Sequence, residues 1–173
     1  EFEQGRPLIE RIRKEHPEYR ILQTFFSPSG YEVRKNYQGA DIVCYLPFDT
    51  PRNVRRFIEM VNPCMVFFIK YEFWQNYLNT LYKKGIPVYS VSSIFRPNQI
   101  FFRWYGKDYR KVLKTFSHLF VQNEVSEKLL ASIGVTDVTI VGDTRFDRVL
   151  DICTVAKDLP LVKAFKGNSK TFV

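Results

Sequence analysis

The 173 residues are 45% hydrophobic, enough to bury the core of one domain, and this composition excludes a generally disordered chain. The net charge of +8 favours an anionic partner, either phosphate groups, a membrane surface or nucleic acid. No apolar run in the sequence reaches membrane-spanning length. Cys44, Cys64 and Cys153 lie singly in apolar segments, so we predict buried, reduced thiols rather than a metal site or a disulfide framework.

Short apolar runs alternate with amphipathic segments along the chain. The apolar runs predict strands at residues 19–25, 41–46, 65–69, 88–91, 118–121 and 137–141. The amphipathic segments predict helices at residues 7–15, 28–37, 51–61, 73–84, 98–116, 125–133 and 145–152. This order predicts βαβ units, and therefore an α/β fold with a parallel sheet flanked by helices on both faces.

The alternating pattern weakens after residue 155, which predicts a domain over residues 1–155 and a linker over residues 156–173. The chain opens at Glu1 without a Met, and residues 171–173 resemble the start of another strand. We therefore expect a fragment whose first strand lies upstream and whose second domain lies downstream.

A carboxylate, an indole and an amide follow the third predicted strand, at Glu72, Trp74 and Asn76. The next helix begins directly after them, so Glu72 is placed on a strand-to-helix turn at the carboxyl end of a strand. Ligands bind along that edge in open α/β sheets. From its position alone, Glu72 is equally well interpreted as an exposed turn carboxylate without a function.

Hydroxyl groups and a glycine mark the turn after the first predicted strand. Ser27, Ser29 and Gly30 stand at the start of a predicted helix, where free amides and the helix dipole favour an anion. Ordinary helix capping is the more common explanation of such residues. The sequence has neither GxGxxG nor GxxxxGK[ST], so nothing in it supports a dinucleotide or P-loop site.

The predicted helix over residues 98–116 carries two stripes. An apolar stripe is formed by Phe101, Tyr105, Tyr109, Val112 and Phe116, and a basic one by Arg103, Lys107, Arg110 and Lys114. These stripes fit a core helix with a solvated basic face, but Phe102 and Trp104 exceed what one buried face needs and favour a membrane-surface helix. Single-stranded nucleic acid also suits interleaved bases and aromatics, although the order of elements is not that of an RRM, KH or OB domain.

Several segments together form a recognisable ordered set. They are residues 1–13, 24–30, 45–49, 72–76, 86–87, 122–124 and 142–147, which read as E…PLIERIR, TFFSPSG, YLPFD, EFWQN, IP, QNE and GDTRFD. Over about 150 residues this set resembles the amino-terminal half of the Kdo transferases. These enzymes move 3-deoxy-D-manno-octulosonic acid (Kdo) from CMP-Kdo to a lipid A precursor at the inner face of the bacterial membrane.

The resemblance implies a GT-B fold, of which this chain is the Rossmann-like acceptor half, while CMP-Kdo binds mostly to a carboxyl-terminal domain outside the chain. It implies that Glu1 is the general base of an inverting transfer and that Glu72 supports it or positions the acceptor. The expected acceptor-binding residues are Glu72, Asn76, Ser27, Ser29, Gly30 and Arg96. The residues expected to face an anionic membrane, on the cytoplasmic side of the inner membrane, are Phe102, Arg103, Trp104, Lys107 and Arg110. We expect no metal, no cofactor and no nucleic-acid partner.

Departures from the family pattern leave alternatives open. Lys70 stands where the family has a glutamate, and Gln75 where it has a proline. Residues 92–99 lack the first arginine of the corresponding family segment, and Arg96, two positions later, could substitute for it. These changes suggest a divergent branch with a different acceptor. A peripheral membrane-binding module without catalysis, or another GT-B glycosyltransferase with a nucleotide-sugar donor, are the alternative hypotheses.

Overall fold

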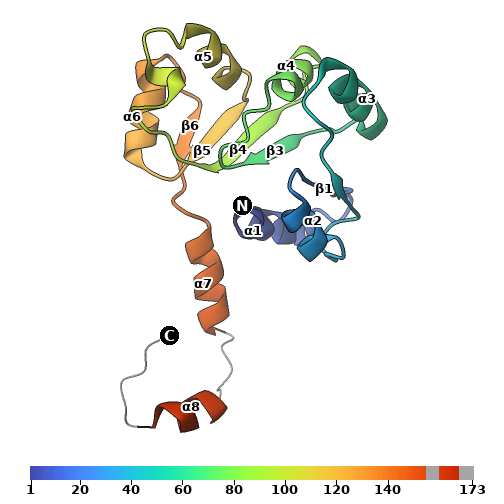
Figure 1. Ribbon diagram of the computed structural model, residues 1–173, viewed down its shortest axis with the longest axis vertical. Helices are drawn as coiled ribbons and strands as arrows, with labels where there is room; N and C mark the ends of the chain where they lie inside the picture. The colour runs from blue at the N-terminus through green and yellow to red at the C-terminus, as the bar shows by residue number, and fades with distance from the viewer. Residues whose placement is uncertain (155–159, 168–173) are drawn as a thin grey trace.

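The computed structural model describes residues 1–154 and 160–167 (Figure 1). Its strands are β1 (Leu22–Phe25), β2 (Ile42–Tyr45), β3 (Val66–Ile69), β4 (Val88–Ser93), β5 (His118–Val121) and β6 (Val138–Ile140). Its α-helices are α1 (Phe2–Glu15), α2 (Pro28–Arg34), α3 (Pro51–Val61), α4 (Gln75–Lys83), α5 (Lys107–Leu113), α6 (Glu124–Ser132), α7 (Arg145–Thr154) and α8 (Pro160–Lys166). A short 3-10 helix, η1 (Ile100–Phe102), precedes α5. Each of the six predicted strands is present within a few residues of its predicted bounds.

Every strand pair in the described chain is parallel, which confirms the predicted α/β class. The strands form two sheets rather than the single sheet that we predicted, a pair β1-β2 and a four-stranded sheet in the order β3-β4-β5-β6. No ladder joins β1 to β3 within the described residues. The carboxyl ends of the strands in the larger sheet lie on one edge, because parallel strands all point the same way.

The core lies between the four-stranded sheet and the helices α3, α4 and α5, which line one face of that sheet in Figure 1. Apolar residues four apart on α3, Val54 and Ile58, point inward together and are buried. β4 is buried along almost its whole length, as expected of a central parallel strand. The fully buried leucines of this core are Leu78, Leu81, Leu113, Leu119 and Leu130.

Helix α1 begins at Phe2, five residues before the predicted start at Pro7. Pro7 therefore lies inside the helix, where it cannot donate the hydrogen bond that the carbonyl of Glu3 would otherwise accept. Tertiary packing of the first turn compensates for this loss. Gln4 and Gly5 are buried there, and a Cβ at Gly5 would lie only 3.1 Å from a side-chain carbon of Ile69 on β3.

The prediction of a single helix over residues 98–116 is wrong. The chain forms η1, turns at residues 103–106 and continues as α5, so the predicted apolar stripe is split. Phe101, Val112 and Phe116 are buried, whereas Tyr105 and Tyr109 are exposed. The break is tightly packed, because a Cβ at Gly106 would lie 1.8 Å from the carbonyl oxygen of Ile100.

The prediction that all three cysteines are buried needs correction. Cys64 and Cys153 are exposed, since Cys64 lies in the turn before β3 rather than in the strand, and only Cys44 is partly buried. Burial raises the pKa of the Cys44 thiol. Within the segment predicted to be a linker, residues 160–166 form α8, while residues 155–159 and 168–173 lie outside the described part of the chain.

Candidate functional site

Two carboxylates meet at the carboxyl edge of β3. Glu1 is the N-cap residue of α1, and Glu72 follows β3 on a turn that opens at Lys70, whose φ of 64° is in the left-handed region. The half-buried Glu72 accepts a hydrogen bond from the indole Nε1 of Trp74. Burial, and next to it the negative charge of Glu1, raises the pKa of Glu72. The fold thus brings together the two acidic residues that the sequence placed 71 positions apart.

A close carboxylate pair has a simple chemical consequence. When one group ionises, its charge makes ionisation of the other less favourable, so the two resist holding two charges at once. Such pairs supply acid and base roles from the same residue type. Positive φ at a non-glycine residue such as Lys70 costs about 1–3 kcal/mol and is found most often at functional turns.

Substitution of Glu72 by Gln should flatten the pH dependence of stability. The pKa of Glu72 is raised in the folded state, so the fold holds this proton more tightly than the unfolded chain, and stability is lost as pH rises above about 4.3. Gln cannot ionise, so the Tm of Glu72→Gln should fall less than that of the parent between about pH 4 and 7. Thermal melts of the 173-residue chain across this range measure the effect. Glu59→Gln, at an exposed position on α3, is the control, and equal slopes in both variants would contradict the burial of Glu72.

An aromatic shelf borders the two carboxylates. We define it as Phe26, Phe48 and Trp74, which follow β1, β2 and β3 respectively. The ring centroid of Phe26 lies 4.7 Å from that of Trp74 and 5.7 Å from that of Phe48. Phe48 is 70% exposed and Phe26 is 46% exposed, so the shelf presents apolar rings to solvent beside the site. Sequence reasoning did not single out Phe26, because only the fold places it next to Trp74.

The acceptor-binding residues predicted in the turn after β1 take part in capping α2. Ser27 Oγ accepts a hydrogen bond from the backbone nitrogen of Gly30 at 3.2 Å and lies 3.2 Å from Ser29 Oγ. Asn76 is likewise engaged, since its side-chain nitrogen donates to the carbonyl of Asp49 at 2.7 Å. Asp49 in turn caps α4 by accepting from the backbone nitrogens of the first turn. These residues shape the carboxyl edge through local hydrogen bonds.

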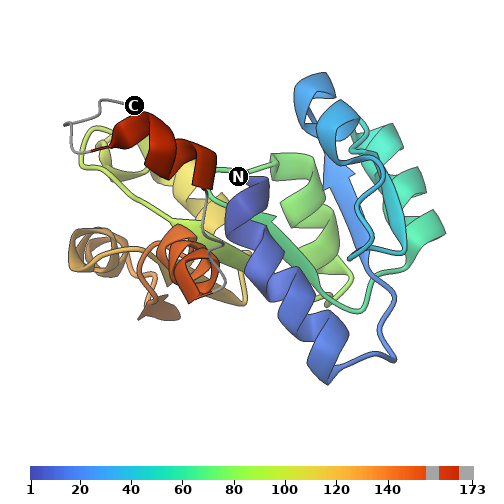
Figure 2. The same cartoon turned by 90° about the horizontal axis from the view of Figure 1, so that it is seen from below.

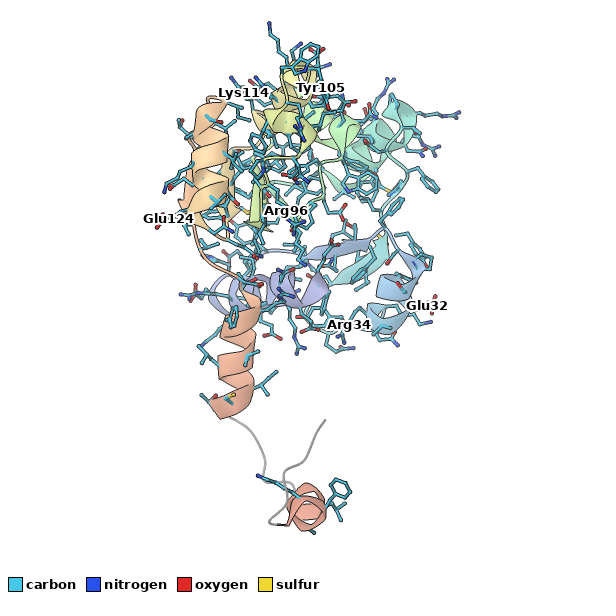
Figure 3. The ribbon with its side chains drawn as sticks, turned by 60° about the vertical axis from the view of Figure 1, so that its left-hand side comes forward. Glu32, Arg34, Arg96, Tyr105, Lys114 and Glu124 are labelled. Atoms are coloured by element: carbon cyan, nitrogen blue, oxygen red, sulfur yellow. The ribbon has the colours of Figure 1, made fainter. Side chains whose placement is uncertain are left out.

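Arg96 lies on the loop after β4, and its side chain is exposed. Figure 3 shows it between the end of the four-stranded sheet and the level of α1. Its backbone nitrogen donates to Gln99 Oε1 at 2.9 Å, which closes the loop on itself. Because β3 and β4 are parallel, the loop that carries Arg96 leaves the sheet at the same edge as the turn that carries Glu72.

A buried polar network that sequence reasoning missed anchors the first turn of α1. The side chain of Gln4 is 1% exposed and donates at 3.3 Å both to Ser92 Oγ and to Asp143 Oδ1. Gln122 also donates to Ser92, whose φ is 59°. The Arg145 guanidinium lowers the pKa of Asp143 to about 2. The network joins α1 to the last residues of β4 and to the loops after β5 and β6, so it fixes where Glu1 stands. In the sequence, its only signal was that Gln122 and Asp143 fall in the segments QNE and GDTRFD.

The residues predicted to face a membrane separate into two groups. Trp104 is 89% exposed, and Arg103 and Lys107 are exposed beside it. Phe102 instead turns partly inward, with its ring 6.1 Å from that of the buried Phe95. Arg110 donates to the carbonyls of Phe101 and Arg103 at 2.7 and 2.8 Å, so it braces the turn between η1 and α5.

The described residues contain neither a membrane-spanning helix nor a cluster of metal ligands. No helix in the ranges 1–154 and 160–167 is both long and apolar enough to span a bilayer. In the same ranges, no three His, Cys, Asp or Glu side chains gather as a group that could hold a metal ion.

The fold and the match to a known family define the class of protein. The fold is that of one Rossmann-like half of a GT-B protein: it aligns with the UDP-GlcNAc 2-epimerase of Neisseria meningitidis, solved with UDP-GlcNAc bound, with a TM-score of 0.64 and 15% identity over 96% of this chain and 50% of that one. The family described as 3-deoxy-D-manno-octulosonic-acid transferase (kdotransferase) matches residues 1–148. The chain belongs to this family, as the sequence resemblance predicted.

Curated relatives carry the same name. The chain is 26% identical to the 3-deoxy-D-manno-octulosonic acid transferase of Haemophilus influenzae, over 82% of this chain and 34% of that protein. It is also 26% identical to the enzyme of that name from Aquifex aeolicus, over 99% of this chain and 49% of the relative. The chain thus spans between a third and a half of the length of these relatives.

Proposed function

We propose that this chain is the acceptor-binding half of an inverting glycosyltransferase that moves Kdo from CMP-Kdo to a lipid A precursor. The observation that carries the proposal is the pairing of Glu1 with Glu72 at the carboxyl edge of the sheet. Family membership supports the reaction class. The cytidine nucleotide of the donor is assigned to a second domain, since the relatives are at least twice as long as the part matched here.

Glu1 is the general base in this proposal. An acceptor hydroxyl attacks the anomeric carbon of Kdo, CMP departs from the opposite side, and a carboxylate takes the hydroxyl proton as the bond forms. Glu1 is exposed at the start of α1, where an acceptor can reach it, while the half-buried Glu72 is held by Trp74. Glu72 therefore positions the acceptor, and burial together with the negative charge of Glu1 raises the pKa of its own carboxyl group.

The aromatic shelf suits an acceptor that combines sugar rings with acyl chains. Its rings offer apolar contact, and they lie next to a carboxylate that can accept hydrogen bonds from sugar hydroxyls. Ser27, Ser29, Gly30, Asn76 and Arg96 stand on neighbouring turns of the same edge. Among these, Arg96 carries the exposed positive charge that a phosphorylated acceptor would favour.

The transfer assay compares two proteins. The intact enzyme is expected to move Kdo from CMP-Kdo to a lipid A precursor, whereas the 173-residue chain alone should show no turnover, because the proposal assigns the donor site to the part of the relatives that this chain does not match. Turnover should be unchanged by EDTA, since we assign no metal to the reaction. Robust transfer by the chain alone would overturn the division into acceptor and donor halves, and loss of activity in EDTA would contradict a metal-free mechanism.

The turn between η1 and α5 is the proposed contact with the cytoplasmic surface of the inner membrane. Trp104, Arg103 and Lys107 are exposed together there. An indole in the headgroup region and positive charge towards anionic lipids are the two contributions that hold a peripheral protein on a bilayer. Phe102 and Arg110 support this turn from inside, through ring packing and carbonyl hydrogen bonds.

Vesicle binding tests this surface. The variant Arg103→Glu, Trp104→Ala, Lys107→Glu should bind vesicles containing anionic lipid at least roughly 30-fold more weakly, because each basic residue contributes about 1 kcal/mol. Its melt should stay close to that of the parent, since these side chains are exposed. Arg11→Glu with Lys35→Glu makes the same change in net charge, on α1 and just after α2, and is the control. Equal loss of binding in both variants would show that binding depends only on net charge. Unchanged binding by the first variant would show that the turn between η1 and α5 does not contact the membrane.

A further inference from the structure

The carboxyl end of β4 is irregular. Val91 pairs with Phe120 on β5, and Ser93 pairs with the next residue of that strand. Ser92 is therefore an extra residue, which makes this part of β4 a β-bulge, and its φ of 59° is in the left-handed region. Both Ser92 and Ser93 are completely buried. We define these two residues as the serine bulge.

Ser93 holds the segment that carries Glu72. Its hydroxyl donates to the backbone carbonyl of Lys70 at 2.8 Å and also lies against the hydroxyl of Ser90. The backbone nitrogen of Lys70 donates to the carbonyl of Val91 at 2.9 Å, so the end of β4 fixes both backbone polar groups of Lys70. Because Lys70 opens the turn, the bulge determines the direction in which the chain leaves β3 towards Glu72.

Ser92 holds the segment that carries Glu1. Gln4 Nε2 donates to Ser92 Oγ at 3.3 Å, and the backbone nitrogen of Gln4 donates to the carbonyl of Glu1 at 3.0 Å. Gln122 Nε2 donates to the same hydroxyl at 2.9 Å and to the carbonyl of Ser92 at 3.0 Å, which fixes that hydroxyl in place. Figure 2 shows α1 in front of the four-stranded sheet, and the contact with Ser92 joins its first turn to β4.

Stability alone does not account for the amide of Gln4. Asp143, whose pKa the guanidinium of Arg145 lowers to about 2, is an ionised carboxylate that only accepts hydrogen bonds, so Gln4 turns its nitrogen towards it. The amide oxygen of Gln4 is then buried, and it accepts no hydrogen bond from any residue that the structure describes. Such an oxygen is costly, and an apolar side chain of the same shape would avoid the cost. We therefore look for the role of this amide in the groups that its nitrogen holds in place.

Backbone strain gathers at the same place. Lys70 and Ser92 are two of the three non-glycine residues with a positive φ in the ranges 1–154 and 160–167. Strain of this kind persists only where the surrounding structure holds it, and it clusters at functional sites. Both residues lie at the carboxyl ends of adjacent strands, β3 and β4. One leads along the chain to Glu72, and the other leads through Gln4 to Glu1.

We propose that the serine bulge positions the carboxylate pair, Glu1 and Glu72. One hydroxyl acts through the carbonyl of Lys70 and the other through the amide of Gln4. Because the two serines are adjacent, a single rigid element fixes the two carboxylates relative to each other. Both serines are completely buried, so they act through these residues and not on a substrate. The catalytic consequence rests on the proposed function, since a misplacement of about 1 Å can cost about 100-fold in rate.

The coupling between the two carboxylates is measurable without turnover. In the 173-residue chain, the side-chain carboxyl carbon of Glu72 reports its pKa by NMR titration. Burial, and next to it the charge of Glu1, raises this pKa, so Glu1→Gln should lower it, and the size of the change is the coupling. In chains that carry Ser92→Gly or Ser93→Ala, the coupling should fall to about half of its parent value or less.

Both variants should keep the fold. Glycine adopts the φ of Ser92 without strain. Gln4 and Gln122 each keep another acceptor in the Ser92→Gly chain, namely Asp143 Oδ1 and the carbonyl of residue 92. If one of the two variants unfolds, the other still decides the proposal.

Ser126→Ala is the matched control. Ser126 is also completely buried, but its hydroxyl bonds to Asn123 and to the backbone nitrogen of Phe95 rather than to the segments that carry the carboxylates. Its loss should lower Tm and leave the coupling between Glu1 and Glu72 unchanged. A role of the serine bulge in stability alone would make its variants behave like this control.

Three outcomes would overturn the proposal. They are an unchanged coupling in the folded bulge variants, an equal loss of coupling in Ser126→Ala, and a pKa of Glu72 that does not respond to Glu1→Gln. In the intact enzyme, the bulge variants should lower kcat at least roughly tenfold and leave the KM for CMP-Kdo unchanged. If the intact parent enzyme transfers no Kdo, the proposed function fails, whereas the coupling in the 173-residue chain still decides the positioning role.

Discussion

Replacement of Glu1 by Gln in the intact transferase should lower kcat by roughly 10²–10⁴-fold, the usual contribution of a positioned general base. Gln keeps the size of the side chain and its hydrogen-bonding capacity but cannot take the proton of the acceptor hydroxyl. The backbone carbonyl of Glu1, which accepts from the nitrogen of Gln4 at 3.0 Å, is unaffected, so α1 should keep its first turn. Steady-state kinetics with saturating CMP-Kdo measure the loss.

Glu10→Gln is the matched control for this experiment. Glu10 lies on the same helix, is exposed, and pairs with Arg6 at 2.7 Å, so its substitution makes the same change in charge without touching the site. Its kcat should stay within about twofold of the parent, because an exposed helix ion pair contributes little. Near-full turnover by Glu1→Gln, with its melt unchanged, would remove Glu1 from the role of base and leave Glu72 as the carboxylate to test.

Gly106→Ala should destabilise the chain by about 3 kcal/mol, and lower Tm by roughly 6–12 °C for a domain of this size. The backbone at Gly106 has φ −83°, which any residue adopts, so the cost is steric: the new Cβ would meet the carbonyl oxygen of Ile100 at 1.8 Å. The turn that carries Trp104 would have to move. Thermal and urea melts of the 173-residue chain measure the change.

Gly85→Ala separates steric from conformational cost. Gly85 ends the turn after α4 with φ 68°, and no atom lies within 4 Å of its built Cβ, so only the left-handed backbone penalises Ala there. The expected loss at Gly85 is about 1 kcal/mol. If Gly106→Ala proves no worse than Gly85→Ala, the tight return of the chain between η1 and α5 is wrong, and the predicted continuous helix regains support.

Most of the fold could be predicted from local sequence signals. Six short apolar runs became six strands, because short runs rich in β-branched and aromatic residues are typical of strands in a parallel sheet. Ser27-Pro28 and Thr50-Pro51 are typical helix starts, and the two hydroxyls do cap α2 and α3. The parallel pairing followed from the alternation of strands and helices.

Predictions failed where distant contacts override local preference. The apolar residues of 98–116 follow a helical period without a break, yet the chain turns between η1 and α5. Two contacts hold this turn: Gly106 packs closely against the carbonyl of Ile100, and the side chain of Arg110 donates a hydrogen bond to the carbonyl of Phe101. Similarly, α1 extends past Pro7 because Gln4 and Gly5 are buried against β3 and the loops beyond it. Neither contact leaves a signature in the residues beside it.

By itself, the sequence determined the α/β class, the order of the elements, the family, and the identity of Glu1 and Glu72 as the acidic residues of interest. Only the tertiary structure decided that these two carboxylates meet, that Phe26, Phe48 and Trp74 form a shelf beside them, and that the strands divide into two sheets. The physical reason is that periodicity and capping act over a few residues. Charge pairing, ring contacts and strand edges depend on which residues far apart in the chain come within a few ångströms of one another.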